Sequence, residues 1–260
     1  SLPFDSENFG DRPLRLGIVG GGAGGVELAL TMQTRLRQLF KVGGLSPALV
    51  EIHLFHRQFN LMTGYPTSVG KCFHQLLMQR GIHLHLGETV RQIAVISESE
   101  SISDRDAQAL EKIIYCESGL TEICDDIFWV THAIAPPWLQ ASGLATDERG
   151  FILVNDTLQS ISHPDIFATG DVATAIHHPR PKAGVFAVRQ GKPLFENLRS
   201  ISSGQSLRAF HPQKRHLALI GTGEARAIAA WGRYWFGPSS WLWFWKDWID
   251  RRFMAQFHKL

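Results

Sequence analysis

The sequence is poor in the residues that mark several protein classes. Its three cysteines, Cys72, Cys116 and Cys124, are too few and too scattered for a disulfide scaffold or a zinc ribbon. With 44% hydrophobic and only 19% charged residues, the chain is neither disordered nor a coiled coil. No apolar run approaches the 18 residues of a membrane span, and residues 1–13 lack the pattern of a secretion signal. We therefore expect a cytoplasmic protein, and the net charge of +2 gives no reason to expect nucleic acid as a partner.

The chain opens instead with a strand, a glycine-rich loop and a helix. Leu14–Val19 is apolar and leads directly into residues 20–25, after which the apolar periodicity becomes helical to about Phe40. The order of the following elements predicts an α/β fold: a three-layer Rossmann-like domain that contains a β-meander. The later segments expected as strands are 49–55, 82–86, 89–96, 112–116 and 127–131, and a second helix is expected over 68–80.

The glycine-rich loop has the G-x-G-x-x-G spacing, met by Gly20, Gly22 and Gly25. In such loops the first glycine allows a tight turn, the second admits a pyrophosphate, and the third lets the helix pack closely on the strand. Residues from Ala23 onward then present free N–H groups and a positive dipole end to the phosphates. The sequence predicts a dinucleotide site here, with a purely structural glycine turn as the alternative.

The end of the second strand normally carries an acidic residue that binds the ribose hydroxyls of NAD. His56 and Arg57 hold that place here. An arginine at this point pairs well with a 2′-phosphate, so NADP is permitted, although a solvated arginine is an equally good interpretation. The choice between NAD and NADP stays open.

Other motifs favour structural roles. Gly221-Thr222-Gly223 also follows apolar residues, but its sixth position is Arg226, so we predict a hairpin turn. His83 and His85 lie on one face of a strand, and His177 and His178 are adjacent in a loop. Because neither pair has a nearby cysteine or carboxylate at ligand spacing, no metal site is expected.

Two segments together resemble a known family. The stretch from Ser162-His163-Pro164 through Ile166-Phe167-Ala168-Thr169-Gly170-Asp171, with Gly22–Ala29, resembles the two-dinucleotide-binding flavoproteins. That family includes pyridine nucleotide-disulfide oxidoreductases, type II NADH dehydrogenases and sulfide:quinone oxidoreductases. The resemblance implies hydride transfer from a nicotinamide to FAD. It places Gly170 and Asp171 at the FAD ribityl chain or pyrophosphate, Lys182 at the flavin ring and Glu27 near the nicotinamide. A carboxylate such as Glu27 is also favourable near a helix N-terminus in any case.

A closer resemblance is to the oxidoreductase domain fused ahead of selenide, water dikinase in some bacteria. Trp129–Ala133 with Ala135-Pro136 carries it, together with Gly221–Ala227 and Lys246–Phe253. It implies an intact enzyme that supplies reduced selenium to a kinase domain.

The family's first glycine loop, which binds FAD, has no counterpart in the sequence. The expected domains are therefore an NAD(P) domain over 12–133, the return half of an FAD domain over 134–200, and a C-terminal region with an aromatic helix over 201–260. Residues 136–199 are expected to be loop-rich with short strands. We expect such a portion to bind FAD weakly or not at all by itself and to be inactive alone, with the catalytic residues unknown.

The C-terminal helix carries an aromatic stripe opposite a charged side that includes Lys246. We expect the stripe to pack on the missing FAD half or on a partner chain, which includes a homo-oligomer, with a peripheral membrane contact as the alternative. Two other functions stay open: a non-catalytic docking scaffold, and a sulfide- or quinone-linked flavoenzyme that does not use NAD(P)H. The stripe comprises Trp241, Phe244, Trp245, Trp248, Ile249 and Phe253.

Overall fold

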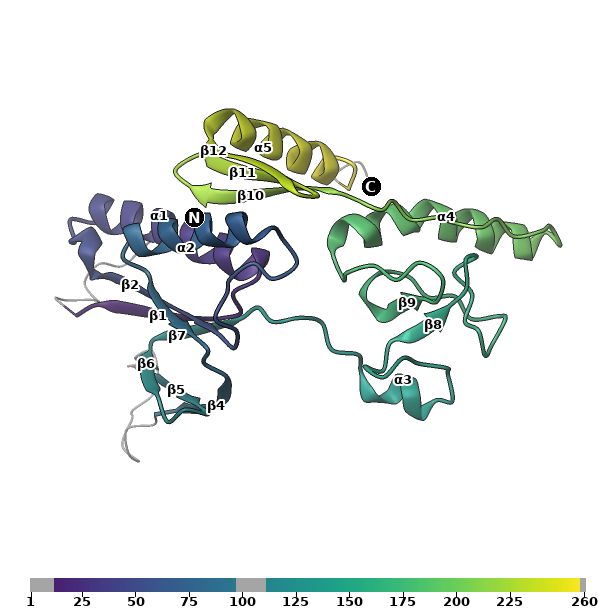
Figure 1. Cartoon of the computed structure of the whole chain (residues 1–260), viewed down its shortest axis with the longest axis horizontal. Helices are drawn as coiled ribbons and strands as arrows, with labels where there is room; N and C mark the ends of the chain where they lie inside the picture. Colours follow the sequence, from purple (N-terminus) through teal and green to yellow (C-terminus); the bar gives the residue numbers. More distant parts are fainter. Residues whose placement is uncertain (1–11, 97–110, 258–260) are drawn as a thin grey trace. The chain divides into compact units, whose positions relative to one another are not determined.

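The computed structural model describes residues 12–96 and 111–257, which divide into two compact units. Unit 1 combines the chain up to Thr131 with the segment from Leu217 onward, and unit 2 is His132–His216. The boundary after Thr131 lies two residues before the end of the expected 12–133 domain. Most of the expected 201–260 region belongs to unit 1 rather than to a region of its own. Figure 1 shows the two units, with the C-terminal segment in yellow-green beside the purple N-terminal segment.

Unit 1 is built on a four-stranded parallel sheet in the order β3-β2-β1-β7. The strands pair in parallel throughout, with Leu14 opposite Val50 and Leu16 opposite Asp126. Two helices cover one face, where their apolar side chains join those of the strands in one core. The elements are β1 (Leu14–Val19), α1 (Ala23–Val42), β2 (Val50–His56), α2 (Thr67–Gln79), β3 (His83–Leu86) and β7 (Asp126–Trp129), with a 3-10 turn at Pro47–Leu49.

An antiparallel meander covers the other face of this sheet. Strand residues alternate between faces, so Ile52 and Leu54 of β2 enter the helical core while Phe55 packs against Ile114 of the meander. Helices, parallel sheet and meander therefore form the three expected layers, and the expected Rossmann-like fold is confirmed. The meander strands are β4 (Val90–Val95), β5 (Lys112–Cys116) and β6 (Thr121–Cys124), of which β6 was not expected from the sequence.

The C-terminal segment adds a second antiparallel sheet and a helix to unit 1. Ile220 and Ile228 join the helical core, which attaches this sheet to α1. A hairpin is present, but Gly221-Thr222-Gly223 is not its turn as expected: these residues end β10, and the turn residues are Glu224 and Ala225, both at φ +51°. The elements are β10 (Leu217–Gly223), β11 (Arg226–Trp231), β12 (Tyr234–Ser239) and α5 (Ser240–Met254).

Unit 2 has a small core of its own, centred on Leu139, Phe151 and Val154. Its two short strands pair in parallel, and a long helix follows. The expectation of a loop-rich segment with short strands is wrong for this helix, because Pro193 lies inside it and mimics a helix breaker in the sequence. The elements are α3 (Pro137–Ala141), β8 (Ile152–Val154), a 3-10 turn at Gly170–Val172, β9 (Ala173–Ala175) and α4 (Gly184–Ser202). Among the described residues, no helix of either unit combines the length and apolarity needed to cross a membrane.

Candidate functional site

The three motif glycines occupy three different environments at the carboxyl end of β1. Gly20 has φ +129°, and a Cβ there would lie 2.5 Å from the carbonyl oxygen of Val130. A Cβ on Gly25 would lie 1.8 Å from the carbonyl oxygen of Gly20. Gly22, in contrast, has no atom within 4 Å of its Cβ position. The first and third glycines are therefore required by the fold itself, while the second leaves open space above the loop.

The N-terminus of α1 opens onto that space. Gly22 is its N-cap, no side chain caps it, and the first turn contains no acidic residue. The first N–H groups of an α-helix have no partner within the helix, so those from Ala23 onward are available to an anion. Glu27 lies beyond the first turn and leaves this positive end uncompensated.

His56 contacts the glycine loop through a hydrogen bond to its backbone. The N–H of Gly21 donates to its Nδ1 at 3.1 Å, and the imidazole ring is buried. A Cβ on Gly21 would lie 2.7 Å from the ring Cγ of His56 and 2.5 Å from the Leu61 side chain. Sequence reasoning missed Gly21, although the run of three consecutive glycines was a signal. Arg57, the next residue, is exposed at the same edge of the sheet.

A pocket of about 400 Å³ lies beyond β2, between the following loop and α2. Leu61 and Met62 line this pocket and also adjoin the glycine loop. The N–H of Met62 donates to the Gly21 carbonyl at 2.9 Å. Since β1 and β2 run in parallel, this pocket and the glycine loop open at the same edge of the sheet. The glycine loop does not itself line the pocket. Its polar lining includes Asn60, Thr63, Thr67, Lys71, His74 and Gln75.

Glu27 faces the C-terminal segment. Its Oε1 accepts the N–H of Gly221 at 3.0 Å and lies 3.4 Å from Nζ of Lys246. Burial alone would lower the pKa of Lys246, but its bonds to Asp250 and Glu27 outweigh burial and raise it. The carboxylate therefore ties α1 to β10 and α5.

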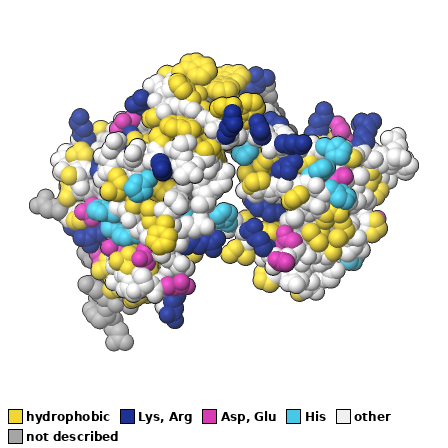
Figure 2. All heavy atoms as spheres, viewed as in Figure 1, with side chains coloured by type: hydrophobic (Ala, Val, Ile, Leu, Met, Phe, Trp, Pro, Cys, Tyr) yellow, Lys and Arg dark blue, Asp and Glu magenta, His cyan; other side chains and the backbone are white. Residues whose placement is uncertain are grey.

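The aromatic stripe of α5 is exposed rather than packed on described residues. Trp241 and Trp248 are 67% and 55% exposed, whereas Leu242 is buried. Lys246 follows Leu242 by one helical turn and so faces α1. Figure 2 shows hydrophobic side chains gathered over these C-terminal elements of unit 1.

In unit 2, the residues expected to face the flavin line one shallow depression. Gly170, with φ +69°, donates its N–H to Oε1 of Gln190 at 2.6 Å. Lys182 donates to the Ala173 carbonyl and to Thr174 Oγ1, and its Nζ lies 4.1 Å from the centre of the Phe151 ring. Burial lowers the pKa of Lys182. The depression, which Asp171 also lines, holds about 20 Å³, room for about one water, so it is at most the floor of a flavin site.

The cysteines are free thiols, and two are buried in the meander. Burial, with the nearby charges of Glu88 and Glu122, raises the pKa of Cys116 to about 11. Burial and Glu122 raise the pKa of Cys124 to about 12. Burial also raises the pKa of Cys72. A reactive cysteine requires a lowered pKa, so the raised pKa values speak against a redox-active pair among these thiols.

The chain is similar in sequence to several curated proteins. Among curated proteins, ferroptosis suppressor protein 1 of Xenopus laevis is 23% identical over 228 residues, which are 85% of this chain and 54% of that protein. NADH oxidase of Lactococcus lactis subsp. cremoris is 27% identical over 175 residues, 66% of this chain and 33% of that protein. The chain thus spans about half or less of the length of these relatives.

Solved structures share the fold at low identity. A FAD-dependent pyridine nucleotide-disulphide oxidoreductase from Desulfovibrio vulgaris aligns with a TM-score of 0.58 at 21% identity, over 83% of this chain and 48% of that one. An engineered water-forming NADPH oxidase bound to NADPH aligns with a TM-score of 0.55 at 21% identity, over 83% and 42%.

The profile of one family covers most of the sequence. Residues 5–191 match the family described as pyridine nucleotide-disulphide oxidoreductase, which is consistent with the expected cofactors, FAD and a nicotinamide dinucleotide. The match takes in the glycine loop of unit 1 and the Gly170-Asp171 turn of unit 2. The chain therefore belongs to the pyridine nucleotide-disulphide oxidoreductase family.

Proposed function

We propose that this chain is the nicotinamide-nucleotide-binding portion of an FAD-dependent NAD(P)H oxidoreductase. In the intact protein, a hydride would pass from the bound nicotinamide to the flavin, which accepts the electron pair. One observation carries the proposal: the glycine loop packs against backbone at Gly20, which meets Val130, and at Gly25, which meets Gly20, yet stays open at Gly22. A turn that served packing alone would have no need of a glycine at the open position.

The pyrophosphate would lie over Gly22, bound by the free N–H groups of α1 from Ala23 onward. Gly20 and Gly25 give the loop its shape. The adenosine ribose would extend along the edge of the sheet toward Arg57, while His56 holds the loop through Gly21. An exposed guanidinium and no acidic residue at this place favour NADPH over NADH.

We assign Glu27 to the attachment of the C-terminal segment rather than to the nicotinamide. Both its hydrogen bond to Gly221 and its ion pair with Lys246 point to β10 and α5. In this assignment, Glu27 connects the C-terminal segment directly to α1, the helix that carries the pyrophosphate site.

Gly170, Asp171 and Lys182 would form the part of the flavin site that unit 2 supplies. The Lys182 ammonium would stabilise negative charge on a reduced flavin. Because the depression they line is small, the remaining FAD contacts would come from elsewhere in the intact protein. The chain alone should therefore retain little FAD and have no oxidoreductase activity.

Calorimetric titration of the chain with NADPH and NADH tests the dinucleotide site, with Gly22→Glu as the variant. Gly22 has φ −78° and open space around it, so a glutamate there leaves the fold intact and places a carboxylate at the pyrophosphate position. The matched control is Gly191→Glu on α4 of unit 2, another glycine with no atom within 4 Å of its Cβ position. Binding of NADPH that Gly22→Glu abolishes and Gly191→Glu preserves is the expected result.

The same titration tests the docking scaffold, and the cysteines bear on the sulfide-linked enzyme. A docking scaffold predicts that neither dinucleotide binds, despite the intact loop. A sulfide-linked enzyme needs reactive cysteines beside the flavin, and the raised pKa values of Cys116 and Cys124 speak against it.

We further propose that the intact protein serves selenium metabolism, as the resemblance of the Lys246–Phe253 tail to the selenide, water dikinase fusion suggests. This part rests on the resemblance alone. Its test is whether NADPH oxidation by the full-length protein depends on an added oxidised selenium compound. Oxidation that proceeds equally without selenium would refute the link while leaving the oxidoreductase assignment in place.

A further inference from the structure

A cluster of histidine side chains with one glutamate lies within unit 1, on the face of the parallel sheet that the meander covers. In β2, His53 alternates with the core residues Ile52 and Leu54 and so points toward the meander, as Phe55 does. The register pairs His53 with His83 and Phe55 with His85, which puts all these rings on one face. The rings of His53 and His83 stack with their centres 4.6 Å apart.

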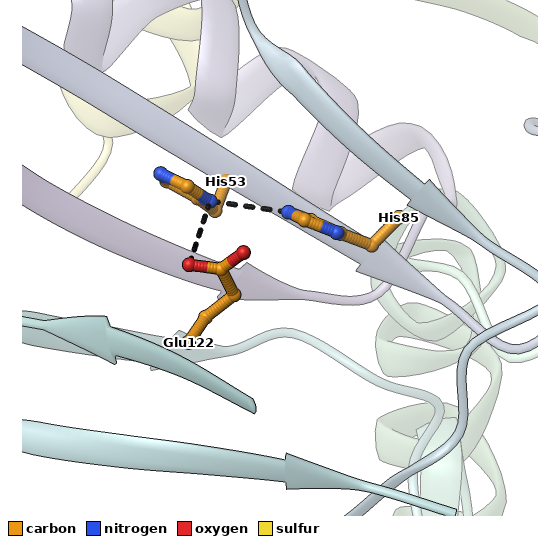
Figure 3. Close-up of side chains that lie close together, drawn as sticks. All are labelled: His53, His85 and Glu122. Atoms are coloured by element: carbon orange, nitrogen blue, oxygen red, sulfur yellow. Dashed lines mark hydrogen bonds and ion pairs between the residues drawn. The ribbon is translucent and has the colours of Figure 1, made fainter. Parts of the chain in front are cut away.

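Glu122 reaches this cluster from β6, on the facing layer. Nδ1 of His53 lies 3.1 Å from Nε2 of His85 and 3.9 Å from Oε2 of Glu122. The three ligand-type atoms all lie within 4.8 Å of one another. Figure 3 shows the two imidazoles and the carboxylate converging from three strands on one point.

Two imidazole nitrogens and one carboxylate oxygen form a ligand set that zinc adopts in proteins. Tetrahedral coordination with Zn–N bonds of about 2.0–2.1 Å places neighbouring ligand atoms roughly 3.3 Å apart. The two histidine nitrogens already have nearly that separation. The Glu122 side chain is 30% exposed, so one side of it is not packed, and a change of rotamer would shorten its separation from both nitrogens.

We propose that His53, His85 and Glu122 form a binding site for a divalent transition metal of the zinc class, which joins β2 and β3 of the parallel sheet to β6 of the meander. Three protein ligands leave a fourth position for water. The sequence concealed the site because its ligands come from three separate strands. The site is distinct from the dinucleotide loop and does not depend on the proposed oxidoreductase function.

A second group of similar composition, Asp156, His178 and His211, lies in unit 2 and is more exposed. It must be silenced before metal binding in unit 1 is measured. His211→Ala does so at an exposed position. This variant is the reference for all comparisons, because any zinc that it binds cannot be held by the complete unit 2 group.

The experiment titrates the whole chain carrying His211→Ala with zinc chloride by calorimetry, and with Co²⁺ by visible absorption, which reports tetrahedral coordination. The test variants add His85→Ala or Glu122→Gln, and the control adds His74→Ala, an exposed histidine on α2 of the same unit. We expect one zinc per reference chain and no change with His74→Ala. Each test variant should weaken binding by at least about tenfold, the lower end of the loss on removing even an outer-shell partner.

Far-UV circular dichroism identifies a variant that fails to fold, and Glu122→Gln keeps the test valid if His85→Ala is such a variant. Zinc affinity that is unchanged in a folded His85→Ala or Glu122→Gln chain would overturn the proposal. So would the absence of zinc binding to the reference chain. In either case the short His53–His85 contact would be an ordinary N–H···N hydrogen bond.

Discussion

Gly25→Ala should destabilise unit 1 through one steric clash. The added Cβ would lie 1.8 Å from the carbonyl oxygen of Gly20, whereas real Cβ atoms essentially never approach another heavy atom closer than 3.0 Å. The helix and the loop must therefore separate by more than 1 Å, and neither neighbour is a flexible side chain. Forced overpacking of this kind costs about 3 kcal/mol at the upper end of its usual range. For a folding unit of this size, that corresponds to a fall in Tm of roughly 6–12 °C.

Differential scanning calorimetry measures the effect. Because the chain has two units, two transitions are expected, and the transition that NADPH shifts upward belongs to unit 1. Gly22→Ala is the matched control: it makes the same chemical change three residues away, at φ −78° and with no atom within 4 Å. Its stability should stay within about 0.5 kcal/mol of the parent.

Two results would refute the reasoning. If Gly25→Ala left the unit 1 transition unchanged, the close packing of helix on strand would be wrong. If Gly22→Ala destabilised the unit as much as Gly25→Ala, the open space above Gly22 would be wrong. In that case the assignment of a pyrophosphate to this position would lose its basis.

Three other perturbations test separate contacts. His56→Leu leaves the buried N–H of Gly21 without its acceptor. The free energy of unfolding, measured in urea, should fall by about 1–3 kcal/mol, and NADPH binding should weaken. An unchanged urea midpoint would argue against the contact. Because the pKa of Lys246 is raised on folding, its ion pairs with Asp250 and Glu27 stabilise the chain fully below pH 10.5, the ordinary lysine value, and this contribution fades as pH rises further. Lys246→Met should remove that alkaline loss, which unfolding at a series of pH values detects. The buried thiols Cys116 and Cys124 should resist alkylation at pH 8 and react only after unfolding, as intact-mass spectrometry shows. Rapid modification of both in the folded chain would contradict their burial.

The sequence by itself determined the features that depend on near neighbours. The strand before Gly20, the spacing to Gly25 and the helix after it follow local rules of periodicity and backbone freedom. In the structure β1 has the expected bounds, and α1 begins at Ala23, within the glycine-rich run, and ends two residues beyond Phe40. The C-terminal hairpin likewise followed from the missing glycine at Arg226.

Local rules were wrong where a residue type normally breaks a helix. The sequence did not predict α4, because Pro193 and Gly191 interrupt its helical pattern. Tertiary packing through Phe186 and Asn197 outweighs the low helix propensity of both residues. Packing of this kind is not encoded in the spacing of a single segment.

Only the tertiary structure decided which distant side chains meet. Glu27 binds Gly221, 194 residues away, because Ile220 and Ile228 place the C-terminal sheet against α1. The strand register and the meander, in turn, bring Glu122 to the two histidines of the proposed metal site. Pairing across strands depends on how sheets stack and align, and no local sequence pattern specifies that alignment.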